Sequence, residues 1–172
     1  MPSIIIVKNT YPDFGALERT LSYIQRSSIV GGYALDPTFA FQQMAKLKTV
    51  WHKEEGVQLL HFIIAFTHQE AFRISVDEVL ELGFQIGILF SDYQLAYAVH
   101  MDSSHLHLHC ILNTVSFVDG HKYSDGLAGF WRLKTMLQTQ FPKFDIGIYR
   151  SFPNSKINTF SFSKEDYLLR ID

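Results

Sequence analysis

The sequence predicts an α+β domain in which helices pack on a central, mostly antiparallel β-sheet of about five strands. Three observations predict this class. The expected elements follow the order β-α-α-β-α-β-β-α, two strands stand next to one another in the middle of the chain, and 172 residues suffice for one domain with a single core. The chain has no internal repeat, low-complexity tract or linker, so residues 1–172 are expected to form one domain.

Strands are predicted where β-branched and apolar residues form short runs between turn-forming residues. Residues 9–13, Asn-Thr-Tyr-Pro-Asp, form a turn after the first run, and Asp119-Gly120 forms a turn after the fourth. The segment Ser27–Asp36 carries Gly31-Gly32 and is predicted to be an exposed loop. The predicted strands are Ser3–Lys8, Gly56–Thr67, Tyr93–Met101, Leu106–Ser116 and a short piece at Asp145–Tyr149.

Helices are predicted where apolar residues recur on one stripe and suitable residues mark the ends. Asp13 is a suitable N-cap for the first helix, Pro37 suits the start of the second, and Pro142 stops the last. Ser75 and Glu78 have the spacing of a capping box. The predicted helices are Asp13 to about Arg26, Thr38–Trp51, Ser75 to about Phe90, and Leu127–Gln140.

The composition excludes several classes of protein. The formal net charge of −2 argues against a protein that coats nucleic acid, yet it is compatible with a local basic patch that grips a short strand. Cys110 is the single cysteine, so no intrachain disulfide can form, and a bacterial cytoplasm is the expected compartment. No apolar run reaches the ~18 residues of a membrane span, and the first residues lack the apolar stretch of a signal peptide.

The segment His100–His109, HMDSSHLHLH, holds half of the eight histidines of the chain. Side chains two residues apart in a strand point to the same face. His105, His107 and His109 are therefore expected on one face, with the apolar residues between them in the core. An ordinary solvated sheet face is the alternative, and four histidines in register make it a poor explanation.

A tight two-residue turn at Ser103-Ser104 would set the pairing of the two strands that flank it. It places His100 opposite His107. Asp102 then opposes His105. The converging imidazoles suit one divalent metal ion, and three of them leave coordination positions open for a substrate. Asp102 would orient a ligand imidazole or a water, cap the turn, or do both.

The stretch VHMDSSHLHLHCILNTV resembles the third motif of plasmid relaxases, the mobilisation nucleases of the HUH endonuclease superfamily, with the P-type MOB enzymes nearest. Their pattern is His-x-Asp, a short gap, His-hydrophobic-His and an asparagine. LLHFIIAF resembles the second motif, VDEVLELGFQIG the helix that follows it, and DGHKYSD the stretch after the histidines. The resemblance covers nearly all of residues 1–140 and implies the relaxase palm architecture of this superfamily.

The resemblance implies roles for individual residues. Asp102 is the implied catalytic carboxylate, and His105 and Asn113 are candidates for contacts around the metal ligands. Relatives carry a serine at the end of the second motif, where this chain has Ala65. The implied ligands of one divalent ion (Mn²⁺ or Mg²⁺, with Zn²⁺ as a further candidate) are His100, His107 and His109.

The resemblance also implies a nucleophilic tyrosine on the first helix, and LERTLSYIQR supplies Tyr23 at that place. Helical periodicity puts Tyr23 off the core stripe, so its hydroxyl can point out over the sheet. Tyrosine, with a pKa of about 10, is a weak nucleophile, and a metal ion that draws charge from the phosphate compensates for this. An ordinary tyrosine at the core edge is the alternative interpretation. Tyr11, Tyr33 and Tyr123 are alternative nucleophiles, with Tyr33 foremost.

Basic residues near the two tryptophans are candidates for binding single-stranded DNA. Lys122, after the turn at Asp119-Gly120, is a candidate phosphate contact. A solvated charged helix face is an equally good explanation for the others, which are Lys46, Lys48 and Lys53 near Trp51, and Arg132 and Lys134 near Trp131. The remaining histidines lack a partner at a telling spacing and are expected to be ordinary surface or core residues; they are His52, His61, His68 and His121.

These features predict a relaxase domain that nicks one DNA strand at a transfer origin through a 5′-phosphotyrosine on Tyr23 and can rejoin it. The expected partners are the single-stranded DNA of a plasmid or conjugative element, an accessory DNA-binding protein and a coupling protein. The alternatives are a rolling-circle replication initiator or single-tyrosine transposase, a three-histidine metal hydrolase or oxygenase with another substrate, and a non-catalytic DNA-binding module. Relatives usually continue into a C-terminal region, so the chain is expected to be a fragment or a short member.

Overall fold

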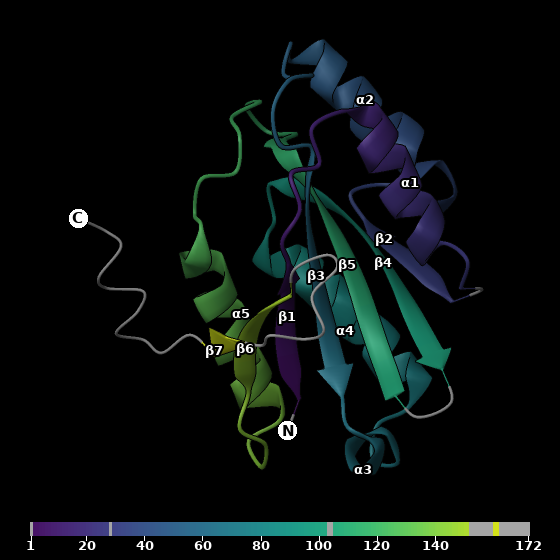
Figure 1. The fold of residues 1–172 in the computed structure, drawn as a ribbon, viewed down its shortest axis with the longest axis vertical. Coiled ribbons are helices and arrows are strands. Elements are labelled where there is room, and N and C mark those ends of the chain that lie inside the picture. The colour runs from purple at the N-terminus through teal and green to yellow at the C-terminus, as the bar shows by residue number, and fades with distance from the viewer. Residues whose placement is uncertain (1, 28, 103–104, 152–159, 162–172) are drawn as a thin grey trace.

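The computed structural model describes residues 2–27, 29–102, 105–151 and 160–161. Seven strands in this part of the chain form one sheet, in the order β2-β4-β5-β3-β1-β6-β7 (Figure 1). The pairing of β1 with β6 is parallel, and the other pairings are antiparallel. The predicted α+β class with a mostly antiparallel sheet is confirmed, although the sheet has more strands than the five or so expected.

The bounds of the central elements agree closely with those predicted from the sequence. The strands are β1 (Ser3–Val7), β2 (Val30–Tyr33), β3 (Leu59–Phe66), β4 (Tyr93–Asp102), β5 (His105–Ser116), β6 (Gly147–Ser151) and β7 (Phe160–Ser161). The helices are α1 (Phe14–Ile24), α2 (Ala40–Val50), α3 (His68–Ala71), α4 (Val76–Leu89) and α5 (Leu127–Gln140), with a 3₁₀ turn at Pro37–Phe39 before α2.

Side-chain caps fix where the helices begin. The Asp13 carboxylate accepts a hydrogen bond from a backbone N–H in the first turn of α1, as predicted. Ser75 and Glu78 form the predicted capping box of α4, with Ser75 N donating to Glu78 Oε2 at 2.7 Å. Thr67 and Glu70 form a second capping box, which starts the short helix α3. The helix α3 is not predictable from hydrophobic periodicity, because one helical turn is too short to show a period.

Helices cover both faces of the sheet. On one face, α4 and α5 share a core cluster with the sheet that includes Phe62 and Leu108. On the other, α1 and α2 share a second cluster with β3, β4 and β5, which includes Leu21 and Ile111. Burying a side chain of this size stabilises the fold by roughly 1.5–3 kcal/mol relative to exposure, so both clusters hold β5 firmly in the centre. In the described part of the chain, none of the helices combines the length and the apolar character that crossing a bilayer requires.

The prediction that Ser27–Asp36 is an exposed loop was wrong, because this segment contains the edge strand β2. Val30–Tyr33 pairs antiparallel with β4, and Gly31 lies directly opposite Tyr97. A Cβ at Gly31 would lie 2.3 Å from Tyr97 Cε2, so only glycine allows the backbone to pack this closely on the ring. Adjacent glycines usually indicate a turn. Only the contact with the Tyr97 ring shows that Gly31 instead lets a strand pack closely on an aromatic side chain.

We expect Gly31→Ala to destabilise the domain by about 1–3 kcal/mol, since the added methyl overlaps the Tyr97 ring. Urea-induced unfolding followed by circular dichroism measures the change in free energy. Gly15→Ala in α1 is the matched control, because its added Cβ meets only the flexible Arg19 and the Asp13 side chain at 3.1–3.2 Å and removes a helical glycine. Equal stability of Gly31→Ala and wild type would show that β2 does not pack on Tyr97 as described.

Candidate active site

Tyr23 lies over the sheet, next to two histidines of the central strands. Its ring centroid is 5.9 Å from that of His100 on β4 and 5.8 Å from that of His109 on β5. The two histidine rings are themselves 4.4 Å apart. Tyr23 occupies the last turn of α1, and His100 Nε2 is 2.8 Å from the carbonyl oxygen of Ile24, so the helix end is tied to the strand. The predicted nucleophile and two predicted ligands therefore meet at one place.

The register of β4 with β5 confirms the predicted pairing of the histidine segment. His100 lies opposite His107, and Asp102 lies opposite His105. The apolar residues between the β5 histidines are buried in the core, as predicted. Ser103-Ser104 and the side chain of Asp102 lie outside the described part of the structure, so the predicted turn and the role of that carboxylate stay predictions.

His107 and His105 continue the row of imidazoles toward the start of β5. The His107 ring is half-buried and lies 6.3 Å from that of His109, and the exposed His105 ring stacks on His107 at 5.8 Å. Among the described residues, no three histidine, cysteine or acidic side chains are close enough to hold a metal ion in their present rotamers.

His61 on β3 belongs to this cluster, contrary to the prediction that it is an isolated histidine. Its Nε2 is 3.1 Å from His109 Nδ1, and its Nδ1 is 3.4 Å from the hydroxyl of Tyr11. The β3–β5 register pairs His61 with Ile111, so His61 is the diagonal neighbour of His109. The signal in the sequence is a histidine within an otherwise apolar strand. The spacing of residues within β3 does not show which residues of β5 lie next to His61.

The hydrogen bonds of this chain are compatible with metal binding by His109. If His109 Nδ1–H donates to His61 Nε2, and His61 Nδ1–H donates to Tyr11, then His109 Nε2 keeps its lone pair for a ligand bond. Likewise, a proton on His100 Nε2 that is donated to the Ile24 carbonyl leaves His100 Nδ1 with a lone pair. Metal-binding histidines are usually oriented in this way by a second hydrogen bond.

Burial keeps the central histidines neutral. Desolvation, and then the nearby imidazole of His100, lowers the pKa of His61 to about 4. Desolvation also lowers the pKa of His109 to about 3, with further contributions from the imidazoles of His61, His100 and His107. Neutral imidazoles with lone pairs are the form that binds a metal ion.

A cavity of about 530 Å³ opens beside Tyr23 and His100. Tyr23 is 47% exposed, which leaves its hydroxyl accessible to a substrate. The Arg26 guanidinium lies 5.8 Å from the Tyr23 ring centroid and also lines the cavity, so a positive charge stands next to the candidate nucleophile. Arg26 is not among the residues predicted from the sequence to belong to the site. The described residues that line this cavity are Tyr23, Arg26, Ser27, Ile29, Val99, His100 and Met101.

Comparison with known proteins agrees with this geometry. Residues 22–141 match the family model of the MobA/VirD2-like relaxase nuclease domain. Two curated proteins named rlx from Staphylococcus aureus are 30% and 25% identical over 107 residues, which is 61% of this chain. The match covers only about a third of each relative, 32% and 33% of their lengths. No solved structure gives a significant match.

The chain belongs to the relaxase family. The matched span includes the cluster of tyrosine and histidines described above, from Tyr23 to His109. Relaxases are DNA-nicking enzymes, and the matched part is their nuclease domain.

The three alternative nucleophiles, Tyr11, Tyr33 and Tyr123, are less exposed than Tyr23. Tyr11 is 5% exposed, and burial raises its pKa to about 12. The Tyr123 hydroxyl donates to the Gly126 carbonyl, and burial raises its pKa. The Tyr33 hydroxyl donates to the Ser91 carbonyl, and the Tyr33 ring packs on Phe84 of α4. Helix α4 covers the face of the sheet opposite the histidines.

Two predicted contacts of the relaxase site are corrected by the structure. Lys48 is fully buried and donates to the Gln58 carbonyl at 2.8 Å and to Thr114 Oγ1 at 3.2 Å, so it cannot contact DNA at the surface. Asn113 is also fully buried, and its amide donates to Gln94 Oε1 at 3.0 Å. Four residues of strand, roughly 13 Å, separate Asn113 from His109, so it does not support the histidine cluster.

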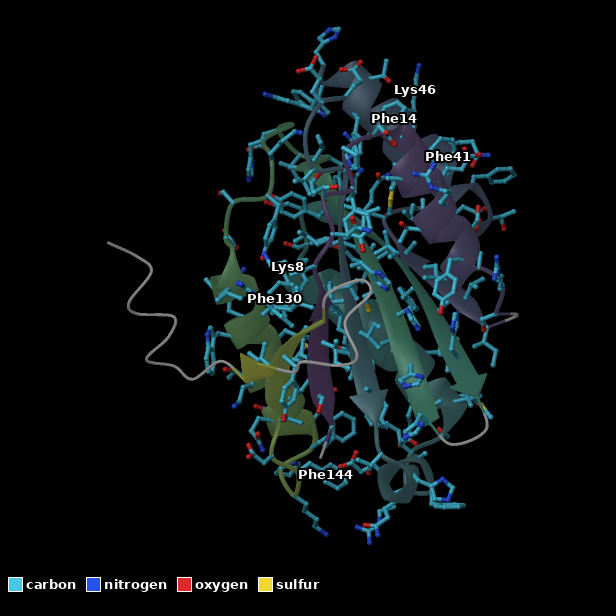
Figure 2. The ribbon with its side chains drawn as sticks, in the orientation of Figure 1. Lys8, Phe14, Phe41, Lys46, Phe130 and Phe144 are labelled. Atoms are coloured by element: carbon cyan, nitrogen blue, oxygen red, sulfur yellow. The ribbon has the colours of Figure 1, made fainter. Side chains whose placement is uncertain are left out.

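The remaining basic candidates lie on different parts of the domain. Lys46 is exposed on α2 (Figure 2). It lies at the end of the molecule opposite to the one where β4 ends and β5 begins. Lys134 lies 5.3 Å from the Trp131 ring centroid, whereas Arg132 forms an ion pair with Asp125 at 2.6 Å; both belong to α5, which packs on the face opposite the histidines. Lys122 donates to the carbonyl of Glu55.

Ala65, the departure from the family serine, lies in β3 between two polar neighbours. It is opposite His107 on β5 and opposite Ser3 on β1. Ser3 therefore carries a hydroxyl in the same row of the sheet, on β1, one strand beyond Ala65 and two strands from His107.

The neutral histidine pair predicts a loss of stability in acid for the metal-free domain. Both folded-state pKa values lie below the unfolded value of about 6.5, so the unfolded chain binds more protons than the native one as the pH falls. The stabilisation is fully present above about pH 6.5 and is lost toward pH 4, with a slope of up to about 1.4 kcal/mol per pH unit for each imidazole.

Urea unfolding in EDTA at several pH values measures this slope. We expect His61→Phe to reduce the slope, because one buried imidazole is removed, and the exposed His105→Ala to leave it unchanged. An unchanged slope in His61→Phe would contradict the assignment of His61 as a buried neutral imidazole.

Proposed function

We propose that this domain nicks one strand of DNA at a transfer origin, with Tyr23 as the nucleophile. The observation that supports this is the meeting of an exposed tyrosine with the His100 and His109 rings beside a cavity. The Tyr23 oxygen would attack the scissile phosphate, forming a phosphotyrosine with the 5′ side of the break while the bond to the 3′-oxygen breaks. Tyr23 gives up one proton and the departing 3′-oxygen takes one, so the step is balanced. The covalent bond keeps the strand end ready for rejoining.

We propose His100, His107 and His109 as the ligands of one divalent ion. When bound, the ion supplies positive charge that stabilises the non-bridging oxygens of the phosphate. Imidazole ligands favour Mn²⁺ or Zn²⁺, whereas Mg²⁺ prefers oxygen. Asp102 is the last residue of β4, and its backbone lies opposite His105. Its carboxylate would orient a ligand imidazole.

The protein groups around Tyr23 would prepare the phosphate for attack. Arg26, beside the Tyr23 ring, is placed to pair with a phosphate oxygen, and bidentate contacts of this kind suit a guanidinium. The bond from His100 to the Ile24 carbonyl would hold the tyrosine helix and the histidine strand in a fixed relation. The family implies that the substrate is a single DNA strand, and we propose that an accessory DNA-binding protein and a coupling protein act with this domain.

We expect His107→Ala and His109→Ala to abolish Mn²⁺ binding in calorimetry, since each removes a proposed ligand. His105→Ala should bind Mn²⁺ nearly as well as wild type, because the exposed His105 ring only stacks on His107. All three variants should unfold cooperatively. Loss of binding in His105→Ala with normal binding in His100→Ala would require a different ligand set.

Tyr23→Phe should bind an oligonucleotide that carries a transfer origin nearly normally but form no covalent adduct. The substitution keeps the ring that packs on His100 and His109 and removes only the attacking oxygen. Denaturing electrophoresis with Mn²⁺ detects the adduct, and mass spectrometry locates it. Tyr33→Phe and Tyr123→Phe are the matched controls and should still form it. Metal-dependent cleavage without an adduct in wild type would identify water as the nucleophile and a hydrolytic nuclease.

A further inference from the structure

A second cavity, of about 570 Å³, lies on the other side of the histidine cluster from Tyr23. Its walls come from the end of β1, the start of β3, the segment between β5 and α5, and β6. Its size falls within the range of pockets that hold small organic ligands, roughly 300–1,000 Å³. The described residues that line it are Ile6, Val7, Lys8, Asn9, Tyr11, Gly56, Val57, Leu59, Leu60, His61, Thr114, Lys122, Tyr123, Ser124, Gly126, Leu127, Phe130 and Arg150.

Basic side chains form part of the described lining of this cavity. Lys8, Lys122 and Arg150 line it, and its described lining contains no aspartate or glutamate. The chain as a whole has a net charge of −2. A low-dielectric wall strengthens the attraction of such a cluster for an anion. Figure 2 labels two of the lining residues, Lys8 and Phe130, in the region of β1 and α5.

A buried lysine lies directly behind the wall of this cavity. The buried Lys48 donates to Thr114 Oγ1, and Thr114 lines the cavity. Burial, and then the charge of Lys122, lowers the pKa of Lys48 to about 7. Lys48 and Lys122 thus repel one another across this wall, and a phosphate in the cavity would offset their repulsion.

Aromatic rings complete the chemistry of a nucleotide site. Tyr123 and Phe130 line the cavity together with Tyr11. Aromatic side chains bind bases of single-stranded nucleic acids by stacking, and lysines bind the backbone beside them. The combination of cations, rings and volume fits a nucleotide better than it fits inorganic phosphate, which would leave most of the cavity empty.

His61 connects this cavity to the proposed nicking site. It is a lining residue, and its Nε2 is 3.1 Å from His109 Nδ1. The cavity is therefore adjacent to the histidine cluster of the proposed nicking site.

We propose that the cavity binds one nucleotide of the substrate strand, with its phosphate against Lys122, Lys8 and Arg150 and its base against Tyr123. This inference rests on the proposed function, because it assigns a place to the same DNA strand. It adds a binding site that lies beyond the tyrosine and the metal ligands and that would position the scissile phosphate.

Binding without cleavage tests the proposal. Every protein carries Tyr23→Phe and is kept in EDTA, and fluorescence anisotropy follows a labelled oligothymidylate of about 12 nucleotides. Lys122→Gln should bind at least fivefold more weakly at about 50 mM salt, and the slope of log K against log salt should fall by about 0.7, the value for one phosphate of a single strand. Lys143→Gln, which removes an exposed lysine outside the cavity, is the charge-matched control and should leave both quantities unchanged.

A second pair of variants keeps the test independent of the Lys122 hydrogen bond to Glu55. Tyr123→Leu should weaken binding about tenfold through loss of stacking, whereas Tyr123→Phe keeps the ring and should bind normally. If Lys122→Gln matches Lys143→Gln and Tyr123→Leu matches Tyr123→Phe, the cavity does not bind the strand. Competition by thymidine monophosphate that depends on Lys122, with oligothymidylate binding unaffected, would identify a free-nucleotide site and also overturn the proposal.

The two proposals fail separately. An adduct at Tyr23 in otherwise wild-type protein, with unaltered oligothymidylate binding in the Lys122 and Tyr123 variants, overturns only the cavity proposal. Absence of the adduct overturns the proposed function, because the anisotropy measurements do not depend on cleavage.

Discussion

The site depends on the pairing of β5 with its two neighbours in the sheet. β4 on one side brings His100 diagonally next to His109, and β3 on the other side brings His61 diagonally next to it. A shift of either register by one residue would turn the histidines of that strand into the opposite, apolar core. The burial of the side chains that alternate with the histidines, such as Leu106 and Leu108, therefore fixes the positions of the imidazoles.

The same burial decides the chemical state of the histidines. His109 and His61 are nearly inaccessible, and desolvation holds both neutral. Their mutual hydrogen bond, continued to Tyr11, offsets the cost of burying their polar atoms. A neutral and oriented imidazole is suited to binding a cation, so the interactions that maintain the fold also prepare the proposed ligands.

The two cavities divide the surface around this cluster into regions with different properties. The one beside Tyr23 contains the exposed phenol and the Arg26 guanidinium. The other, reached through His61, is lined by three cations and aromatic rings. Basic side chains line both cavities although the net charge of the chain is −2, and a local group of basic residues can attract an anion in a protein of negative net charge.

The sequence by itself determined the elements whose signals are local. The hydrophobic periods of α1, α4 and α5, the cap at Asp13 and the alternation in β5 all depend on neighbours within a few residues, and the structure has them as predicted. The facing of His100 and His107 was also predictable, because a short connection fixes the register of a hairpin. Tertiary structure alone decided the rest. The strand at Gly31 exists because of the distant Tyr97 ring, His61 joins the cluster through a strand pairing 48 residues away, and Lys48 is buried because α2 packs on the sheet. These contacts bring together residues far apart in the chain, and neither spacing nor composition records which distant segments will meet.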